Sequence, residues 1–433
     1  MMVMRETGPR FPSVSVRDVG LVALALFVFS IPYENGITIS GVGSLARIIG
    51  VVALGVVALT VIDGRFVRLR QASALVVVAA VYATWALATY FWSVAPEATI
   101  TRSATLLQLA AMLWMLHQIG NTERNRNVIA QAFVLGAYSS IAIALAAFFG
   151  GAGGRDVGGL NPNWFAIGCS FAVPIAWGLA IKARRPLTFW VNALYPAFAV
   201  FAVVLSASRG GFVTLLVALT VIPVSLVRLG LARQLLVFVL VVGAAFGTFV
   251  AAPQVFTGLE ANIERLQGTV DEIESGTLTG RTVIWDAGVE AFLASPLVGH
   301  GYHSFRRVVE PILGLGRSAH NAYLSVAVGS GVIGLALFLA LIVVVTIGVV
   351  ASPERRLEFL VIVATVVVAM VPANLENNKS VWFLLGWLAA ARPLLIVPHR
   401  VMHPRSHTEP LIVRRPVVAK AMGVTDADTR TNG

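Results

Sequence analysis

Three residues combine a side chain suited to phosphate or proton chemistry with a position at the edge of an apolar segment. Arg209 lies in the stretch Ser-Ala-Ser-Arg-Gly-Gly at 206–211, a polar hinge between two apolar runs. Arg281 follows a Thr-Gly pair at the start of an expected helix, where free N–H groups and the helix dipole favour an anion. His320 opens an apolar run after a long polar loop. Ionisable residues at the edge of an apolar bundle cost free energy, so these three are predicted to be functional.

These side chains suit two kinds of chemistry. A neutral imidazole, with an ordinary pKa of about 6.5, can remove a proton from a hydroxyl group. Arginine binds phosphate through forked, charge-assisted hydrogen bonds. The structural alternatives are an interfacial anchor for Arg209, a solvated helix-start charge for Arg281 and a satisfied boundary histidine for His320. Their shared location favours function, and Asn321 stands beside His320, where it can orient the ring.

Other polar residues give weaker signals. His300 and His303 lie in a glycine-containing turn, and the tail histidines at 399, 403 and 407 have prolines among them that argue against a helical metal site. The sequence contains no HExxH motif, no paired carboxylates in an apolar span and no glycine-rich phosphate loop. A DxD-like triplet occurs at 426–428, in the tail. We therefore expect no metal ion and no cofactor.

The composition determines which kind of fold can position these residues. Of 433 residues, 57% are hydrophobic and 12% are charged, whereas an average soluble protein has about 25% charged residues. A soluble globule and a disordered chain are both excluded. We predict an all-α polytopic membrane protein with about twelve transmembrane helices. The expected spans are 18–33, 44–62, 73–91, 100–119, 127–149, 163–181, 187–206, 210–227, 234–252, 320–349, 357–373 and 380–397.

The distribution of Lys and Arg residues predicts the orientation. Connections on one side of the membrane carry 22 of them, and the opposite connections carry 4 when the long loop 253–319 is left out. Both termini are therefore expected to be cytoplasmic and the long loop extracytoplasmic. The net charge of +11 is then an orientation signal and not a sign of nucleic-acid binding. The single cysteine, Cys169, allows no intramolecular disulfide.

The chain is thus expected to have five parts. They are a cytoplasmic N-terminus (1–17), transmembrane helices 1–9 (18–252), the extracytoplasmic loop (253–319), transmembrane helices 10–12 (320–397) and a disordered basic cytoplasmic tail (398–433). Within the loop, apolar residues at alternating steps of four and three predict an amphipathic helix over 258–274. A second loop helix is expected from Thr279 to Ser295, where Pro296 ends it.

The order of short motifs resembles the O-antigen ligase and polymerase superfamily of bacterial envelope glycosyltransferases. The resemblance covers about residues 200–335. Each motif is short, and their order around one long loop is what is specific. The motifs are Ser206–Gly211, Gly280–Trp285, Ser295–Gly301, His320–Leu324 and Gly329–Leu335, with Trp92, Pro96, Arg102 and the Asn-Pro-Asn stretch at 161–163 upstream.

The resemblance implies a membrane fold related to the GT-C class, acting on the outer face of the bacterial cytoplasmic (inner) membrane. The implied reaction moves a glycan from undecaprenyl diphosphate to an acceptor hydroxyl, with inversion and without a metal. His320 would be the general base, and Arg209 and Arg281 would bind the diphosphate. Asn321 would orient the base. Further substrate contacts would come from Arg317, Arg102 and Tyr323.

Several functions fit this resemblance. A ligase would pass the glycan to lipid A core, a polymerase to another carrier-linked repeat, and a third relative to a protein. The single long loop and the modest chain length favour the ligase. A flippase for the lipid-linked glycan is an alternative of a different class. It is disfavoured because the middles of the spans hold almost no ionisable residues.

Overall fold

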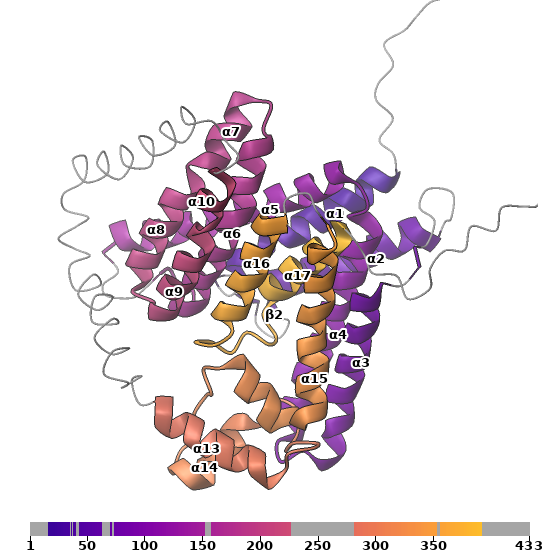
Figure 1. Cartoon of the computed structure of the whole chain (residues 1–433), viewed down its shortest axis with the longest axis vertical. Coiled ribbons are helices and arrows are strands. Elements are labelled where there is room, and N and C mark those ends of the chain that lie inside the picture. Colours follow the sequence, from indigo (N-terminus) through magenta and orange to yellow (C-terminus); the bar gives the residue numbers. More distant parts are fainter. Residues whose placement is uncertain are drawn as a thin grey trace, which may run out of the picture. The chain divides into compact units, whose positions relative to one another are not determined.

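The computed structural model describes residues 16–34, 36, 38–39, 43–62, 70–71, 73–151, 157–226, 281–352 and 356–391. Over these ranges the chain is built mainly from helices (Figure 1). One short antiparallel pair of strands is present, in which Thr38 lies opposite Ser44. The elements are α1 (Val16–Ser30), η1 (Ile31–Tyr33), β1 (Thr38–Ile39), β2 (Gly43–Ser44), α2 (Leu45–Ile62), α3 (Ala74–Ala88), η2 (Thr89–Trp92), α4 (Pro96–Ile119), α5 (Glu123–Phe149), α6 (Pro162–Lys182), α7 (Pro186–Ala193), α8 (Tyr195–Ser206), α9 (Arg209–Leu219), α10 (Val221–Leu226), α13 (Arg281–Ala294), α14 (Phe305–Leu313), α15 (Ala322–Val350), α16 (Arg356–Ala369) and α17 (Lys379–Ala391).

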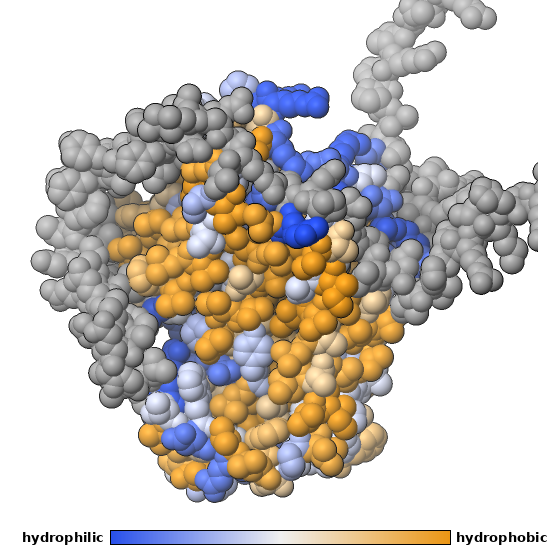
Figure 2. Space-filling view, in the orientation of Figure 1, coloured by the Kyte–Doolittle hydropathy of each residue, from blue (hydrophilic) through white to orange (hydrophobic). Residues whose placement is uncertain are grey.

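Many of these helices are long and apolar enough to cross a bilayer. In the described part of the chain there are 7 such helical segments, together with the shorter apolar helices Asp18–Tyr33 and Lys379–Ala391. Apolar side chains cover the middle of the face seen in Figure 2, over α9, α15 and α16. The protein is therefore a multi-pass membrane protein. The 7 segments are Leu45–Ile62, Ala74–Trp92, Glu123–Phe149, Pro162–Lys182, Pro186–Ser206, Arg209–Leu226 and Ala322–Val350.

Each expected span overlaps a described helix or two consecutive helices wherever the structure describes the chain. The spans expected over 100–119 and 357–373 overlap α4 and α16, which are not among the 7 long apolar segments. The span expected over 234–252 lies outside the described residues, as do the amphipathic helix over 258–274 and the tail from 398. The total of twelve spans and the relation to the GT-C class stay predictions. The second loop helix, expected over 279–295, is confirmed as α13, and the chain turns at Ser295 before Pro296.

Side chains that cap helix starts explain several element boundaries. Thr122 accepts a hydrogen bond from the N–H of Asn125 at the start of α5, and Asn161 accepts from two N–H groups at the start of α6. Proline occupies the first turn of α4, α6 and α7, where its missing N–H costs nothing. These signals are local, so the sequence alone locates these helix starts.

Helix α6 forms the centre of the packing. It contacts α5, α7, α8, α9 and α16, and 89% of its apolar window is buried inside the protein. Small residues allow this close packing. A Cβ added to Gly211 of α9 would lie 2.3 Å from the Cβ of Ala166 in α6, so only glycine fits at that crossing.

A smaller apolar cluster joins α13 and α14 to the start of α15. It contains Ala287, Phe305, Val309 and Val328 among its buried members. Helix α15 is interrupted at Gly331, which has φ 65° and ψ −170°. The turn at 296–301 packs into this break, where the Val332 N–H donates to the Pro296 carbonyl at 2.8 Å. Residues 296–301 are thereby attached to α15.

Candidate active site

Arg209 is the first residue of α9, and its neighbours fix that helix start in place. Ser208 caps α9, because its Oγ accepts a hydrogen bond from the Gly211 N–H at 3.1 Å. The same hydroxyl donates to Oδ1 of Asn163, in the first turn of α6, at 3.0 Å. The starts of α6 and α9 are therefore tied together, and Arg209 projects from a rigid corner.

The glycines after Arg209 allow close contact with the connection between α16 and α17. A Cβ added to Gly210 would lie 3.0 Å from the Cβ of Pro372 in that connection. Together with the contact between Gly211 and Ala166, this leaves α9 little freedom to move. Arg209 thus borders residues 370–378, which we call the α16–α17 connection.

His320 borders the same connection from another direction. The Ala322 N–H donates to the Met370 carbonyl at 2.9 Å. The Asn321 N–H donates to Oδ1 of Asn374 at 3.1 Å. The backbone that carries His320 is therefore held on both residues that follow it, and the imidazole itself is half-buried. The structure brings Arg209 and His320 to one connection, although 111 positions separate them in sequence.

Arg281 is linked to His320 through helix α13. Trp285, one helical turn after Arg281, donates its Nε1–H to the carbonyl of Ala319 at 2.8 Å. Burial lowers the pKa of His320 below its ordinary value, and the positive charge of Arg281 lowers this pKa further. The imidazole is therefore neutral at neutral pH, the state that a general base requires.

Strained backbone is concentrated around these residues. In the described part of the chain, the non-glycine residues with positive φ are Ala207 (46°), His303 (64°) and His320 (47°). The left-handed region costs a non-glycine residue about 1–3 kcal/mol and is often found at functional sites. Ala207 lies two positions before Arg209, and His320 is the expected base. The third residue, His303, lines a cavity described below.

The other expected substrate contacts lie in different surroundings. The carboxamide oxygen of Asn321 caps α15, because it accepts a hydrogen bond from the Leu324 N–H at 3.1 Å. Asn321 therefore stabilises the start of α15 as well. The Tyr323 hydroxyl donates to the Val367 carbonyl at 3.0 Å, as a packing residue does. Arg317 is exposed, three positions before His320. Arg102 is exposed on α4 and lines the cavity that contains His303.

That cavity has a volume of about 370 Å³ and adjoins the α16–α17 connection. Its walls include Arg102, Arg306, His303 and Glu376, and the last of these is 1% exposed. In the sequence His303 is a weak signal, and neither Arg306 nor Glu376 was predicted to belong to a site. A sequence signal did exist, because Asn-Leu-Glu-Asn-Asn-Lys at 374–379 is a dense polar run between two apolar spans. Its burial depends on packing against 302–303 and 325, which the sequence does not reveal.

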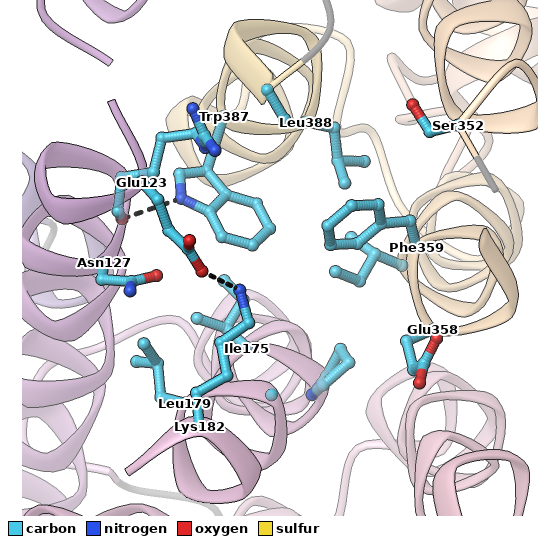
Figure 3. A pocket seen from close by; sticks show the side chains of 15 residues that line it. Glu123, Asn127, Ile175, Leu179, Lys182, Ser352, Glu358, Phe359, Trp387 and Leu388 are labelled. Atoms are coloured by element: carbon cyan, nitrogen blue, oxygen red, sulfur yellow. Dashed lines mark hydrogen bonds and ion pairs between the residues drawn. The ribbon is translucent and has the colours of Figure 1, made fainter. Parts of the chain in front are cut away.

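A smaller cavity, of about 130 Å³, is shown in Figure 3. It lies at the end of α6, the start of α16 and the end of α17, away from the ends that border the cavity of about 370 Å³. Here Lys182 and Glu123 face each other and form an ion pair. Trp387 donates its Nε1–H to the Arg126 carbonyl at 3.0 Å, and its ring meets Phe359 edge-on at 6.0 Å. The Lys182–Glu123 ion pair and the Trp387 hydrogen bond thus join the ends of α5, α6 and α17 to one another.

Comparison with known proteins adds two findings. Residues 194–339 match a family model described as O-Antigen ligase. This segment contains Arg209, Arg281 and His320. A segment of 116 residues is 36% identical to the exopolysaccharide production protein ExoQ of Rhizobium meliloti (strain 1021), covering 23% of this chain and 26% of ExoQ. The match thus spans about a quarter of that relative. Together the findings confirm the resemblance to the O-antigen ligase and polymerase superfamily.

Proposed function

We propose that this protein is a membrane glycosyltransferase that moves a glycan from undecaprenyl diphosphate to an acceptor hydroxyl. One observation carries the proposal. The O-antigen ligase segment holds a half-buried histidine whose pKa is lowered, with Arg281 coupled to it and Arg209 beside the same connection. The superfamily match supports a glycosyltransferase in polysaccharide biosynthesis. The donor, the residue roles and the acceptor are our proposal.

In the proposed reaction, neutral His320 takes the proton from the acceptor hydroxyl. The hydroxyl oxygen then attacks the anomeric carbon from the face opposite the diphosphate, and the bond from that carbon to the phosphate oxygen breaks. Arg209 and Arg281 bind the diphosphate and stabilise the negative charge that develops as it leaves. Attack from the opposite face inverts the anomeric configuration. A diphosphate is a good leaving group, so a base and fixed cations supply the catalysis.

A site at the starts of α9 and α15 suits a lipid-linked donor. These starts border apolar helices, so the polyprenyl tail can stay in the bilayer while the diphosphate meets Arg209. We propose that this end faces the outside of the bacterial inner membrane, with both termini in the cytoplasm, as the Lys and Arg distribution predicts. A reporter fused after Gly433 that proved extracytoplasmic would overturn this orientation.

For the acceptor we propose lipid A core, which makes the protein an O-antigen ligase. A polymerase is the second candidate, and the similarity to ExoQ favours it because that relative is described by exopolysaccharide production. Both reactions use the same base and the same diphosphate site. They differ in the acceptor alone, so an acceptor competition separates them.

The test uses the full-length protein in vesicles with an undecaprenyl-diphosphate oligosaccharide and excess chelator. Lipid A core and a second carrier-linked repeat are offered together, and the products are separated by mass. We expect transfer with the wild type and with Lys182→Gln, a charge change at the opposite end. Transfer is expected to fall by about 10²–10⁴-fold for His320→Ala.

Each part of the proposal has an outcome that contradicts it. Full activity of His320→Ala would exclude the general-base role, and loss of transfer in chelator would exclude the metal-free mechanism. Movement of the labelled lipid across the membrane without any glycan transfer would establish the flippase alternative. Elongation of the carrier-linked repeat in preference to lipid A core would identify a polymerase.

A further inference from the structure

The cavity of about 370 Å³ beside the α16–α17 connection contains more positive charge than its own acids balance. We call it the arginine cavity, after Arg47, Arg102 and Arg306 in its walls. Lys379, also in the wall, is ion-paired with Glu34, and both side chains are largely buried. In contrast, the three arginines form no ion pair with any residue that the structure describes. The cavity is therefore suited to an anionic ligand.

A buried carboxylate in the same cavity lacks a full set of partners. Glu376 is 1% exposed, and its Oε1 accepts a hydrogen bond from the Ser325 hydroxyl at 2.9 Å. This oxygen lies 3.7 Å from Nδ1 of His303. In the described part of the chain, Oε2 of Glu376 and Nδ2 of Asn377 have no hydrogen-bond partner. Unsatisfied buried polar groups are costly, so an acceptor and a donor remain for a ligand that carries hydroxyl groups.

The wall that carries His303 is held rigidly. The Tyr302 hydroxyl donates to Oδ1 of Asn377 at 2.9 Å, and the Thr99 hydroxyl donates to the Tyr302 carbonyl at 2.8 Å. His303 has a left-handed backbone, with φ 64°. The turn also packs against the helices, since Tyr302 is buried and its N–H donates to the Thr89 hydroxyl. The strained residue His303 therefore lies on a fixed support at the cavity wall.

The arginine cavity also adjoins the proposed reaction centre. Asn374 lines the cavity and accepts the hydrogen bond from the N–H of Asn321, next to His320. Trp164 lines it too and follows Asn163, which accepts from Ser208 beside Arg209. A neighbouring cavity of about 440 Å³ shares Arg102, His303 and Arg306. A chain of sugars that reacts at His320 can therefore extend along these walls.

We propose that the arginine cavity binds an acidic sugar residue of the glycan substrate. Arg102 and Arg306 bind the sugar carboxylate through charge-assisted hydrogen bonds. Glu376 Oε2 accepts from a ring hydroxyl, Asn377 Nδ2 donates to another, and Trp164 offers an aromatic face. The inference rests on the proposed glycan transfer and adds the class of sugar that the enzyme selects.

The binding test uses purified full-length protein in detergent, with tetragalacturonate as the acidic probe and maltotetraose as the neutral probe. We expect the wild type to bind tetragalacturonate and to bind maltotetraose at least tenfold more weakly. Arg102→Gln and Arg306→Gln are each expected to weaken tetragalacturonate binding by about tenfold. Glu376→Gln is expected to weaken it as well, while Arg124→Gln, an exposed arginine outside the cavity, leaves the affinity unchanged.

Several outcomes would overturn the proposal. These are failure of the wild type to bind tetragalacturonate, equal binding of the neutral probe, and wild-type affinity in both arginine variants. Displacement by inorganic phosphate at the same affinity would identify a general phosphate site in place of a sugar site. Thermal unfolding of each variant verifies that it is folded. Glycan transfer is measured in parallel, because absence of transfer with intact probe binding would refute the proposed function and leave the acidic-sugar site standing.

Discussion

The two ends of α6, α16 and α17 both carry charged side chains, but they use them in opposite ways. At the end shown in Figure 3, Lys182 pairs with Glu123, and Arg126 donates to the Gly120 carbonyl at 3.3 Å. At the other end, the arginine cavity has Arg102 and Arg306 without an ion pair among the described residues. The first cavity measures about 130 Å³ and the second about 370 Å³.

The two ends also differ in backbone conformation. In the described ranges, all non-glycine residues in the left-handed region lie at the end that holds Arg209 and His320. At the Figure 3 end, the side chains close helix ends with each other and with carbonyl groups. Charge content alone therefore does not identify a site. Arg102 and Arg306, which form no ion pair with a described residue, together with the strained backbone and the larger cavity, favour the second end as the candidate site.

The largest expected difference between the ends concerns catalysis. Arg209→Gln removes a proposed contact to the diphosphate. We expect glycan transfer to fall by about 10²–10³-fold, because removal of one group that stabilises developing negative charge typically has an effect of this size. Lys182→Gln, which breaks the ion pair at the other end, is expected to leave transfer within about twofold. Rates measured in proteoliposomes at matched protein density test both. Equal losses in the two variants would abolish the distinction.

The next effect concerns the packing behind Arg209. Gly211→Ala places a Cβ only 2.3 Å from the Cβ of Ala166. Overpacking of this kind costs about 1–3 kcal/mol, and the shift of α9 is expected to displace Arg209 and reduce transfer. Gly55→Ala in α2 is the matched control, since an added Cβ there meets nothing within 4 Å. Thermal unfolding in detergent measures both, and equal stability of the two variants would contradict the packing argument.

A smaller effect is expected in the pH dependence of transfer. Burial and then the Arg281 charge lower the pKa of His320 below its ordinary value of about 6.5. Because the neutral ring is the base, transfer should fall as the pH drops through this lowered pKa, so the acid limb lies below pH 6.5. Arg281→Gln removes one of the two causes and should move the limb to higher pH. An acid limb above pH 6.5 in the wild type would contradict this assignment.

The smallest effect is expected at the Figure 3 end. The side chains of Lys182 and Glu123 are 36% and 59% exposed, so water screens their attraction. Glu123→Gln should change the free energy of unfolding by less than about 1 kcal/mol. Urea or thermal unfolding measures the change. A loss of several kcal/mol would show that this ion pair organises the helix ends to a degree that its exposure does not explain.

The sequence was most informative where the structural signals are local. Apolar runs located most of the described helices, since a bilayer demands about 20 apolar residues per crossing. The short helix α14 was not predicted. Ser208 and Asn321 are caps that can be read from residue type. The break of α15 at Gly331 was not predicted, because it exists only through packing of the 296–301 turn against it.

In the candidate site, too, some residues could be predicted from the sequence and others could not. Arg209, Arg281 and His320 stood out because cations are scarce beside the expected outer ends of the spans. Glu376 and Arg306 did not, because one belongs to a short connection and the other to a loop rich in charge. Their place in the proposed site depends on the burial of Glu376 and on the cavity that both residues line with Arg102.

The sequence by itself determined that this is a helical membrane protein and where most of its described helices lie, and it singled out the three residues that we propose for glycan transfer. It did so because hydropathy, capping and residue type act over a few positions. The tertiary structure alone decided that the α16–α17 connection joins Arg209 to His320 and that 303–306 and 374–379 enclose a cationic cavity. Those relations depend on contacts between segments far apart in the chain, which only the packed helices bring together.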